Sequence, residues 1–276
     1  MGVQASVKLN DGNAMPMFGL GVFKAEPGQS TYSSVLCALK SGYRHIDTAA
    51  YYRNEADVGK AIQDSGIPRE HIFVTTKLWT GFGGPINYDG TLAALRESLA
   101  KLKMAYVDMY LIHSPNDRAN RLEQWRALEA AKADGLVRSI GVSNYGVHHL
   151  QELERVAKIM PATNQIELHP WLTREELVNY CQRKGIVLTA YSPLAKARKM
   201  NDLKLQALCA KYKRTPAQLL IRWCLAKGFV TIPKSTKEPR IVENMQADFD
   251  MDEQDVKSMS AWNCNMTTGW DPTVGA

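Results

Sequence analysis

The sequence predicts a closed parallel (β/α)8 barrel, the TIM-barrel fold, in one domain over residues 1–276. Short apolar runs followed by segments of helical periodicity recur about every 25–35 residues, which indicates strand–helix units. Eight such units follow one another without a break in composition, as a single barrel requires. A doubly wound sheet is the alternative, but Gly19-Leu20-Gly21 lacks the third glycine of the G-x-G-x-x-G dinucleotide-binding pattern.

A β-hairpin is expected before the barrel, over Val7–Met17, because Asp11-Gly12 is a strong two-residue turn signal between extended arms. Since it has no place in a ring of eight strands, it is expected to close the bottom of the barrel. The eight strands that follow are predicted at Phe18–Phe23, Arg44–Asp47, Ile72–Lys77, Val107–His113, Val137–Ser143, Thr163–Glu167, Val187–Tyr191 and Phe229–Pro233.

The predicted helices alternate with these strands. Two of them start with a capping box, Thr173-x-x-Glu176 and Thr215-x-x-Gln218, and Pro216 stands where a missing N–H costs little. The helices are expected at Tyr32–Lys40, Glu55–Gln63, Gly90–Leu102, Leu122–Ala133, Val147–Ala157, Arg174–Arg183, Pro216–Ala226 and Pro239–Met245.

The composition argues against several classes of protein. The net charge is +6, but the basic residues form no block of like charge, so nucleic-acid binding is not expected. The five cysteines form no C-x-x-C pair, which favours a reducing, cytoplasmic compartment over a disulfide framework or zinc site. No apolar run approaches the ~18 residues of a membrane span, and no secretory signal is present. Residues 1–6 fit the N-myristoylation pattern at Gly2; a chance match is the alternative, and one acyl chain would anchor only weakly.

Polar side chains end the predicted strands, and Tyr52 lies five residues beyond the first of them. The carboxyl ends of the strands meet at one mouth of a parallel barrel, which is where active sites of this fold lie. These strand-end residues are Asp47, Lys77, His113, Ser143, Asn144, Gln165, Glu167, Tyr191, Ser192, Lys234 and Ser235.

The ionisable groups among them suit carbonyl reduction. An Asp47–Lys77 ion pair beside Tyr52 would lower the phenol's pKa from its usual value of ~10, because a nearby ammonium favours the phenolate. Tyr52 could then act as an acid, and His113 could donate a hydrogen bond to the oxygen on which charge develops. No nucleophile–base pair for hydrolysis is evident. A metal-dependent barrel hydrolase is an alternative, but His45 and Asp47 have no third ligand at metal-site spacing, so no metal is expected.

The chain resembles the aldo-keto reductases from the hairpin near Val7 to about Pro272. Several long motifs in the same order carry the resemblance. They are Gly42-Tyr-Arg-His-Ile-Asp47-Thr-Ala-Ala-Tyr-Tyr52-Arg-Asn-Glu55, Thr76-Lys77-Leu-Trp79, Leu111-Ile-His113, Ile140-Gly-Val-Ser143-Asn144, Asn164-Gln165-Ile-Glu-Leu-His-Pro170 and Ile232-Pro-Lys234-Ser235.

The resemblance implies an NADPH-dependent reductase of aldehydes and ketones, with a catalytic tetrad at Asp47, Tyr52, Lys77 and His113. Tyr52 would donate the proton, Lys77 held by Asp47 would lower its pKa, and His113 would orient the carbonyl. Ser143, Asn144 and Gln165 would hold the nicotinamide carboxamide, and Tyr191 would stack on its ring. Further implied cofactor contacts are Gly21, Val22, Phe23 and Asp47, the pyrophosphate-side Ser192 and Leu194, Lys234, Ser235 and Arg240 at the 2′-phosphate, and Glu243 and Asn244 near the adenine.

Substrate would meet Phe23, Tyr52, Trp79 and His113. Phe23 and Ser114 stand where the family often has tryptophan, which predicts a wider and more polar pocket. The short loops resemble the compact branch that includes diketogluconate reductases and prostaglandin F synthases. Expected substrates therefore range over small aldehydes, quinones, keto-sugars and prostaglandin-type carbonyls. Trp270 either lines the pocket or packs on the barrel rim.

The resemblance also suggests a monomer. The alternative from another functional class is a non-catalytic subunit, regulatory or channel-associated, that binds cofactor on the same barrel.

Overall fold

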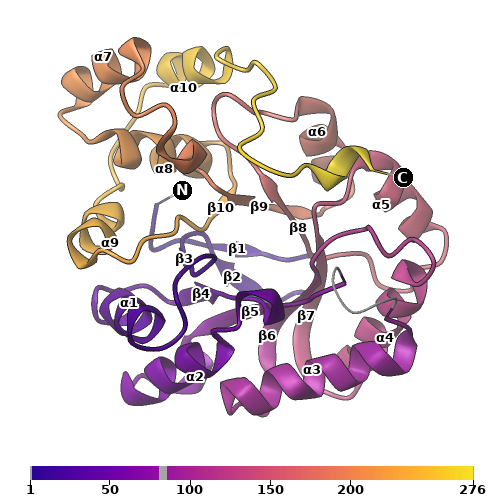
Figure 1. The fold of residues 1–276 in the computed structure, drawn as a ribbon. Helices are drawn as coiled ribbons and strands as arrows, with labels where there is room; N and C mark the ends of the chain where they lie inside the picture. The colour runs from indigo at the N-terminus through magenta and orange to yellow at the C-terminus, as the bar shows by residue number, and fades with distance from the viewer. Residues whose placement is uncertain (1, 81–85, 276) are drawn as a thin grey trace.

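The computed structural model describes residues 2–80 and 86–275. Its centre is an eight-stranded parallel sheet in which neighbours along the chain are neighbours in the sheet, and helices surround it (Figure 1). The strands are β3 (Leu20–Gly21), β4 (His45–Asp47), β5 (Phe73–Leu78), β6 (Val107–Ile112), β7 (Val137–Ser143), β8 (Thr163–Glu167), β9 (Val187–Tyr191) and β10 (Val230–Thr231).

Parallel bridges join the first and last segments of the sheet. Phe18 pairs with Thr231 and Gly21 with Lys234, so the sheet curls back on itself, which fits a (β/α)8 barrel. A Cβ atom added at Gly21 would lie 2.9 Å from the Ile232 carbonyl oxygen. Glycine is needed here because the two strand ends approach so closely.

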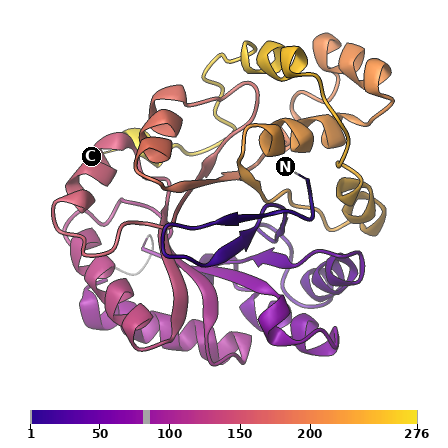
Figure 2. The ribbon, with the colours of Figure 1, turned by 180° about the vertical axis from the view of Figure 1, so that it is seen from behind.

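The predicted hairpin is present as β1 (Ser6–Lys8) and β2 (Ala14–Pro16), paired antiparallel. The Asn10 amide donates to the carbonyl of Pro161 (2.9 Å), and the Asn13 amide donates to that of Arg138 (3.0 Å). Both acceptors lie where strands β8 and β7 begin. The hairpin therefore packs at the amino-terminal end of the sheet, as Figure 2 shows from behind, a position consistent with closing the barrel bottom.

The helices are arranged around the sheet in chain order. Those of the described residues are α1 (Gln29–Lys40), α2 (Glu55–Asp64), α3 (Tyr88–Leu102), α4 (Arg121–Ala133), α5 (Val147–Glu154), α6 (Glu175–Arg183), α7 (Leu203–Tyr212), α8 (Pro216–Ala226), α9 (Glu238–Met245) and α10 (Glu253–Ser260).

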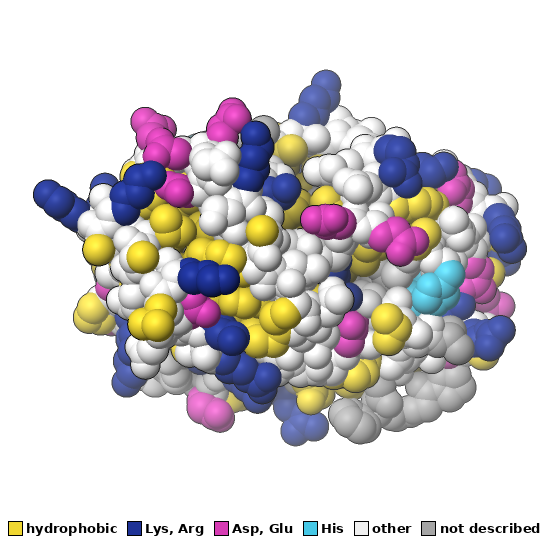
Figure 3. Space-filling model, turned by 90° about the horizontal axis from the view of Figure 1, so that it is seen from above, with side chains coloured by type: hydrophobic (Ala, Val, Ile, Leu, Met, Phe, Trp, Pro, Cys, Tyr) yellow, Lys and Arg dark blue, Asp and Glu magenta, His cyan; other side chains and the backbone are white. Residues whose placement is uncertain are grey.

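Helices α7 and α10 were not predicted. They lie beside each other at the top of Figure 1, and Lys211 joins them through Asp252 (2.7 Å) and Asp255 (2.6 Å). Acidic and basic side chains are interspersed on the face seen from above (Figure 3). The charge on that face is mixed, as expected of a solvated surface rather than a nucleic-acid site.

One predicted capping box is confirmed and the other is wrong. Thr215 accepts from the Gln218 N–H (3.3 Å), while the Gln218 amide oxygen accepts from the Thr215 N–H (3.0 Å). Helix α6 instead begins after Arg174, which has a left-handed backbone (φ 46°). The Thr173 hydroxyl is buried without a hydrogen-bond partner among the described residues, because the chain enters this helix one residue later than the box requires.

Across residues 2–80 and 86–275, no helix combines the length and the apolar character needed to cross a membrane.

Candidate active site

Lys77 is the centre of the site. Its side chain is fully buried, and its ammonium uses all three donors, to the Asp47 carboxylate (2.6 Å), the Thr48 carbonyl (2.9 Å) and the Tyr52 hydroxyl (3.4 Å). Strand β5 presents Lys77 next to the end of β4, where Asp47 lies, so the parallel pairing of these strands creates the ion pair. Burial lowers the pKa of Lys77, and the Asp47 charge opposes that change.

Asp47 makes a second contact across the barrel. Its other carboxylate oxygen accepts a hydrogen bond of 2.7 Å from the Gln165 amide, which β8 supplies. Both oxygens of the buried carboxylate are therefore satisfied. The contact also places Gln165, predicted as a cofactor residue, directly beside the predicted tetrad.

Tyr52 ends a one-turn helix (Ala50–Tyr52) between β4 and α2. The expected lowering of its pKa is not found. Burial raises the pKa of the phenol well above 10, and the Asp47 charge adds to the rise. The Lys77 ammonium does not outweigh this effect, because Asp47 largely neutralises it. Tyr52 is consequently a protonated phenol at neutral pH, which is the form that a proton donor needs.

His113 follows β6 and faces the phenol, with its ring centroid 5.7 Å from that of Tyr52. Burial, and secondarily the Lys77 charge, lower the pKa of His113 well below 6.5, so the imidazole is neutral. Its Nδ1 is buried without a hydrogen-bond partner among the described residues. A tautomer with the proton on Nε2 avoids burying an unpaired donor, and it gives His113 one N–H to offer.

Aromatic rings surround these groups. Trp79 lies 5.2 Å from His113, and Phe23 lies 5.0 Å from Tyr52, between ring centroids. Tyr51 stacks on Trp79 at 4.0 Å and is 40% exposed. The sequence prediction missed Tyr51, and its place next to Tyr52 was no signal, because adjacent residues of a helical turn point in different directions.

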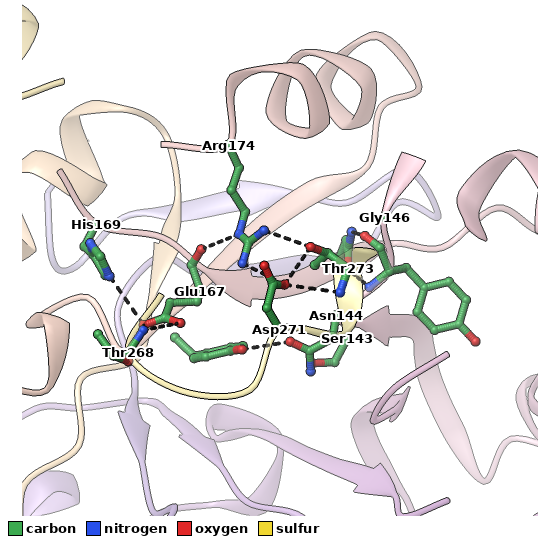
Figure 4. A network of polar contacts seen from close by, with 12 residues as sticks. Ser143, Asn144, Gly146, Glu167, His169, Arg174, Thr268, Asp271 and Thr273 are labelled. Carbon is green, nitrogen blue, oxygen red and sulfur yellow. Dashed lines mark hydrogen bonds and ion pairs between the residues drawn. The ribbon is translucent and has the colours of Figure 1, made fainter. Parts of the chain in front are cut away.

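The predicted carboxamide residues form a second polar cluster, of which Figure 4 shows Ser143 and Asn144. The Asn144 amide donates to the His113 carbonyl (3.0 Å), and its oxygen accepts from the Tyr191 hydroxyl (2.8 Å). Ser143 donates to the Gln165 carbonyl (2.8 Å). Asn144 has a left-handed backbone (φ 64°), a conformation that asparagine adopts more readily than most residues.

Residues 268–275, the C-terminal strap, cross the same end of the sheet (Figures 1 and 4). At one end, the buried Glu167 carboxylate accepts from the Thr268 N–H (3.1 and 3.2 Å). Burial alone would raise the pKa of Glu167, but hydrogen bonds from His169 and Thr268 outweigh this effect and hold that pKa below its usual value. At the other end, Arg174 pairs with Asp271 (2.9 Å). The strap is thus fixed on both sides of Trp270.

Trp270 itself is 53% exposed.

Lys234 and Arg240 are exposed cations at the end of β10 and on α9, and neither pairs with a carboxylate among the described residues. Partial desolvation of its ammonium lowers the pKa of Lys234, while nearby Glu26 opposes that change. Two unpaired cations at the start of a helix fit a phosphate group. The Ser235 hydroxyl accepts from the Lys237 N–H (3.1 Å) just before α9.

Four other predicted cofactor residues have distinct surroundings. Glu243 accepts from the Thr215 hydroxyl (2.7 Å), and Asn244 is buried beside it. Ser192 and Leu194 are half-buried in the segment after β9, where Ser192 has a positive φ of 48°.

The predicted cofactor residues of the first barrel strand differ in exposure. Gly21 and Val22 are buried, and Gly21 serves the closure of the sheet, whereas Phe23 is exposed. Among the described residues, no group of three or more His, Cys, Asp or Glu could hold a metal ion.

Fold and site together define an enzyme of the barrel class with its polar groups at the carboxyl ends of the strands. The aldo/keto reductase family model matches residues 17–263, and the chain belongs to this family. It is an oxidoreductase.

Known members are similar along their whole length. A glyoxal reductase of Bacillus subtilis is 46% identical over 97% of this chain and 96% of its own. A 9,11-endoperoxide prostaglandin H2 reductase of Trypanosoma cruzi is 42% identical, with 96% of this chain and 94% of its own covered. The structure of a Bombyx mori aldo-keto reductase in complex with NADP superposes with a TM-score of 0.88 at 36% identity, covering 96% of this chain and 94% of the other.

Proposed function

We propose that the protein reduces aldehydes and ketones to alcohols with NADPH, with Tyr52 as the proton donor. The observation that carries the proposal is the buried Lys77 ammonium, which Asp47 holds 3.4 Å from a protonated phenol. Hydrolysis would need a nucleophile with a base, and none lies among these groups. A protonated acid beside a fixed cation suits an oxygen that gains negative charge during reduction.

NADPH, when bound, supplies the hydride. Lys234 and Arg240 would grip its 2′-phosphate, and Tyr191 would support the nicotinamide ring from beside Asn144. Ser143, Asn144 and Gln165 would orient the carboxamide. The remaining chemistry belongs to the chain: the neutral His113 donates from Nε2 to the carbonyl oxygen, and the Tyr52 hydroxyl transfers its proton to that oxygen.

The substrate is a small to medium carbonyl compound that fits between Phe23, Tyr51 and Trp79. Tyr51 adds a hydroxyl group to an otherwise aromatic wall, and the hydroxyl of the buried Ser114 lies 3.4 Å from that of Thr80. Polar dicarbonyls such as glyoxal suit this lining, and so do quinones and keto-sugars. The trypanosomal relative is named as a prostaglandin H2 reductase, which supports including prostaglandin H2 among the compounds to test.

The test is NADPH oxidation, followed by absorbance, against a panel of glyoxal, other aldehydes, quinones, keto-sugars and prostaglandin H2. Turnover of at least one carbonyl compound, abolished in Tyr52→Phe, is expected. Tight NADPH binding without turnover of any of them would favour the non-catalytic alternative.

A further inference from the structure

Asn54 is a buried side chain that the proposed chemistry does not use. It lies at the position before α2, two residues after Tyr52, and it is 0% exposed. Although asparagine at this position often caps the following helix, its side chain makes no capping hydrogen bond here. Its amide is engaged elsewhere.

The amide joins three separate segments of the chain. Its Oδ1 accepts from the Thr48 hydroxyl (2.8 Å), and its Nδ2 faces the carbonyls of Val22 (3.1 Å) and Ala25 (3.3 Å) and the hydroxyl of Thr31 (3.4 Å). Carbonyl oxygens only accept, so the nitrogen must lie on their side and the oxygen toward Thr48. The orientation of the amide is therefore determined by its surroundings.

Two of these segments carry groups of the active site. Val22 and Ala25 bracket the turn that presents Phe23, whose ring packs 5.0 Å from Tyr52. The Thr48 carbonyl receives the Lys77 ammonium (2.9 Å).

The buried amide of Asn54 thus connects three parts of the site. They are the turn that carries Phe23, the Thr48 segment that holds the Lys77 ammonium, and the segment that carries Tyr52. The next residue makes a second connection to the site: the buried Glu55 carboxylate accepts from the hydroxyl of Thr76 (2.6 Å), the neighbour of Lys77 on β5.

We propose that Asn54 is a positioning residue that sets the distance between the Tyr52 hydroxyl and the Lys77 ammonium and the placement of Phe23 beside them. The inference rests on the proposed reduction. A buried amide with every donor and acceptor satisfied has one arrangement, and removing it leaves three segments free to shift independently. Displacements of about 1 Å at reacting groups lower rates by about 100-fold.

The test uses the two hydroxyls that meet the amide from opposite sides. Thr48→Val breaks the tie to the segment that holds Lys77, whereas Thr31→Val breaks the tie to α1, away from the site. Thr31 also donates to the Glu26 carbonyl (2.8 Å), so its replacement should cost at least as much stability. We expect kcat to fall by about tenfold or more in Thr48→Val and by less than about twofold in Thr31→Val. The Kd for NADPH should stay within about threefold in both, since neither hydroxyl belongs to the proposed cofactor residues.

Asn54→Ala should lower kcat by about 100-fold. A second readout is independent of turnover: the alkaline ultraviolet titration of Tyr52, taken as the difference between each variant and the same variant with Tyr52→Phe. Loosening the site admits water, so Tyr52 should ionise at lower pH in Thr48→Val than in Thr31→Val. Equal kcat and equal ionisation in these two variants, despite similar losses in Tm, would overturn the positioning role. If the wild-type protein reduced no carbonyl compound, the proposed function would fail while the titration still decided the role of Asn54.

Discussion

The buried ion pair between Asp47 and Lys77 gives a prediction that separates stability from chemistry. Asp47→Asn keeps the shape of the side chain but leaves the Lys77 ammonium without a counter-charge at 0% exposure. Breaking one partner of a buried pair costs about 3–5 kcal/mol, because the remaining charge is uncompensated. Lys77→Met leaves the carboxylate with the Gln165 amide as its one remaining hydrogen-bond donor among the described side chains, and it should cost a similar amount.

The double variant Asp47→Asn with Lys77→Met should be more stable than either single variant, since neither charge is left buried. The loss in Asp47→Asn should also shrink as pH rises. Without its partner, Lys77 in the folded protein has a pKa well below its unfolded value, so the stability lost at neutral pH returns as the solution approaches the unfolded pKa near ~10. Carbonyl reduction should be lost in all three variants.

The assay is urea unfolding of the four proteins at pH 7 and pH 9, with NADPH oxidation measured in parallel. Matched slopes with pH-dependent midpoints would give the free energies directly. Simple addition of the two single losses in the double variant would show that the two charges do not depend on each other, and the reasoning for the site would be wrong.

Other predictions follow from the same contacts. Lys234→Met with Arg240→Ala should raise the Kd of NADPH about 10- to 100-fold more than that of NADH, because only NADPH carries the 2′-phosphate; equal losses would contradict that assignment. Burial keeps the pKa of Tyr52 above 10 and that of His113 below 6.5, so kcat for reduction should stay constant from about pH 7 to 9. An inflection of kcat within that range would contradict the assigned protonation states of Tyr52 and His113. Burial lowers the pKa of His45 to about 4. Between this value and the usual pKa of 6.5, the imidazole binds a proton in the unfolded state but not in the folded state. The contribution of His45 to the free energy of unfolding should therefore fall by about 3 kcal/mol from pH 7 to pH 4, and His45→Gln should reduce the pH dependence by that amount.

The fold was predictable where the sequence repeats a local pattern. The hairpin turn at Asp11-Gly12 and the alternating strand–helix units are each predicted by a few neighbouring residues, and the structure confirms both. Helix α7 is an additional helix between β9 and α8, outside the strand–helix repeat. Its start is marked by Asp202, whose carboxylate accepts from the Lys204 N–H (3.0 Å). Thr173 shows the opposite error: its capping pattern is present, but the helix begins one residue later, after the left-handed Arg174.

The site was predictable to the extent that strand ends converge in a barrel. That rule gathered Asp47, Lys77 and His113 without knowledge of any contact. It could not show that Gln165 reaches Asp47, because this contact crosses the barrel. The direction of the Tyr52 pKa was wrong because burial, unlike spacing, is a property of the whole packed protein. The contacts of Asn54 could not be predicted, because its partners lie between 6 and 32 residues earlier in the chain.

The most direct test of Tyr52 as the proton donor is a comparison of Tyr52→Phe with the wild-type protein, using NADPH and the best carbonyl substrate of the panel. The hydroxyl is removed while the ring that packs against Phe23 remains. The expected result is an unchanged Kd for NADPH with a kcat lowered by at least about 1,000-fold. Retained turnover in this variant would show that another group supplies the proton.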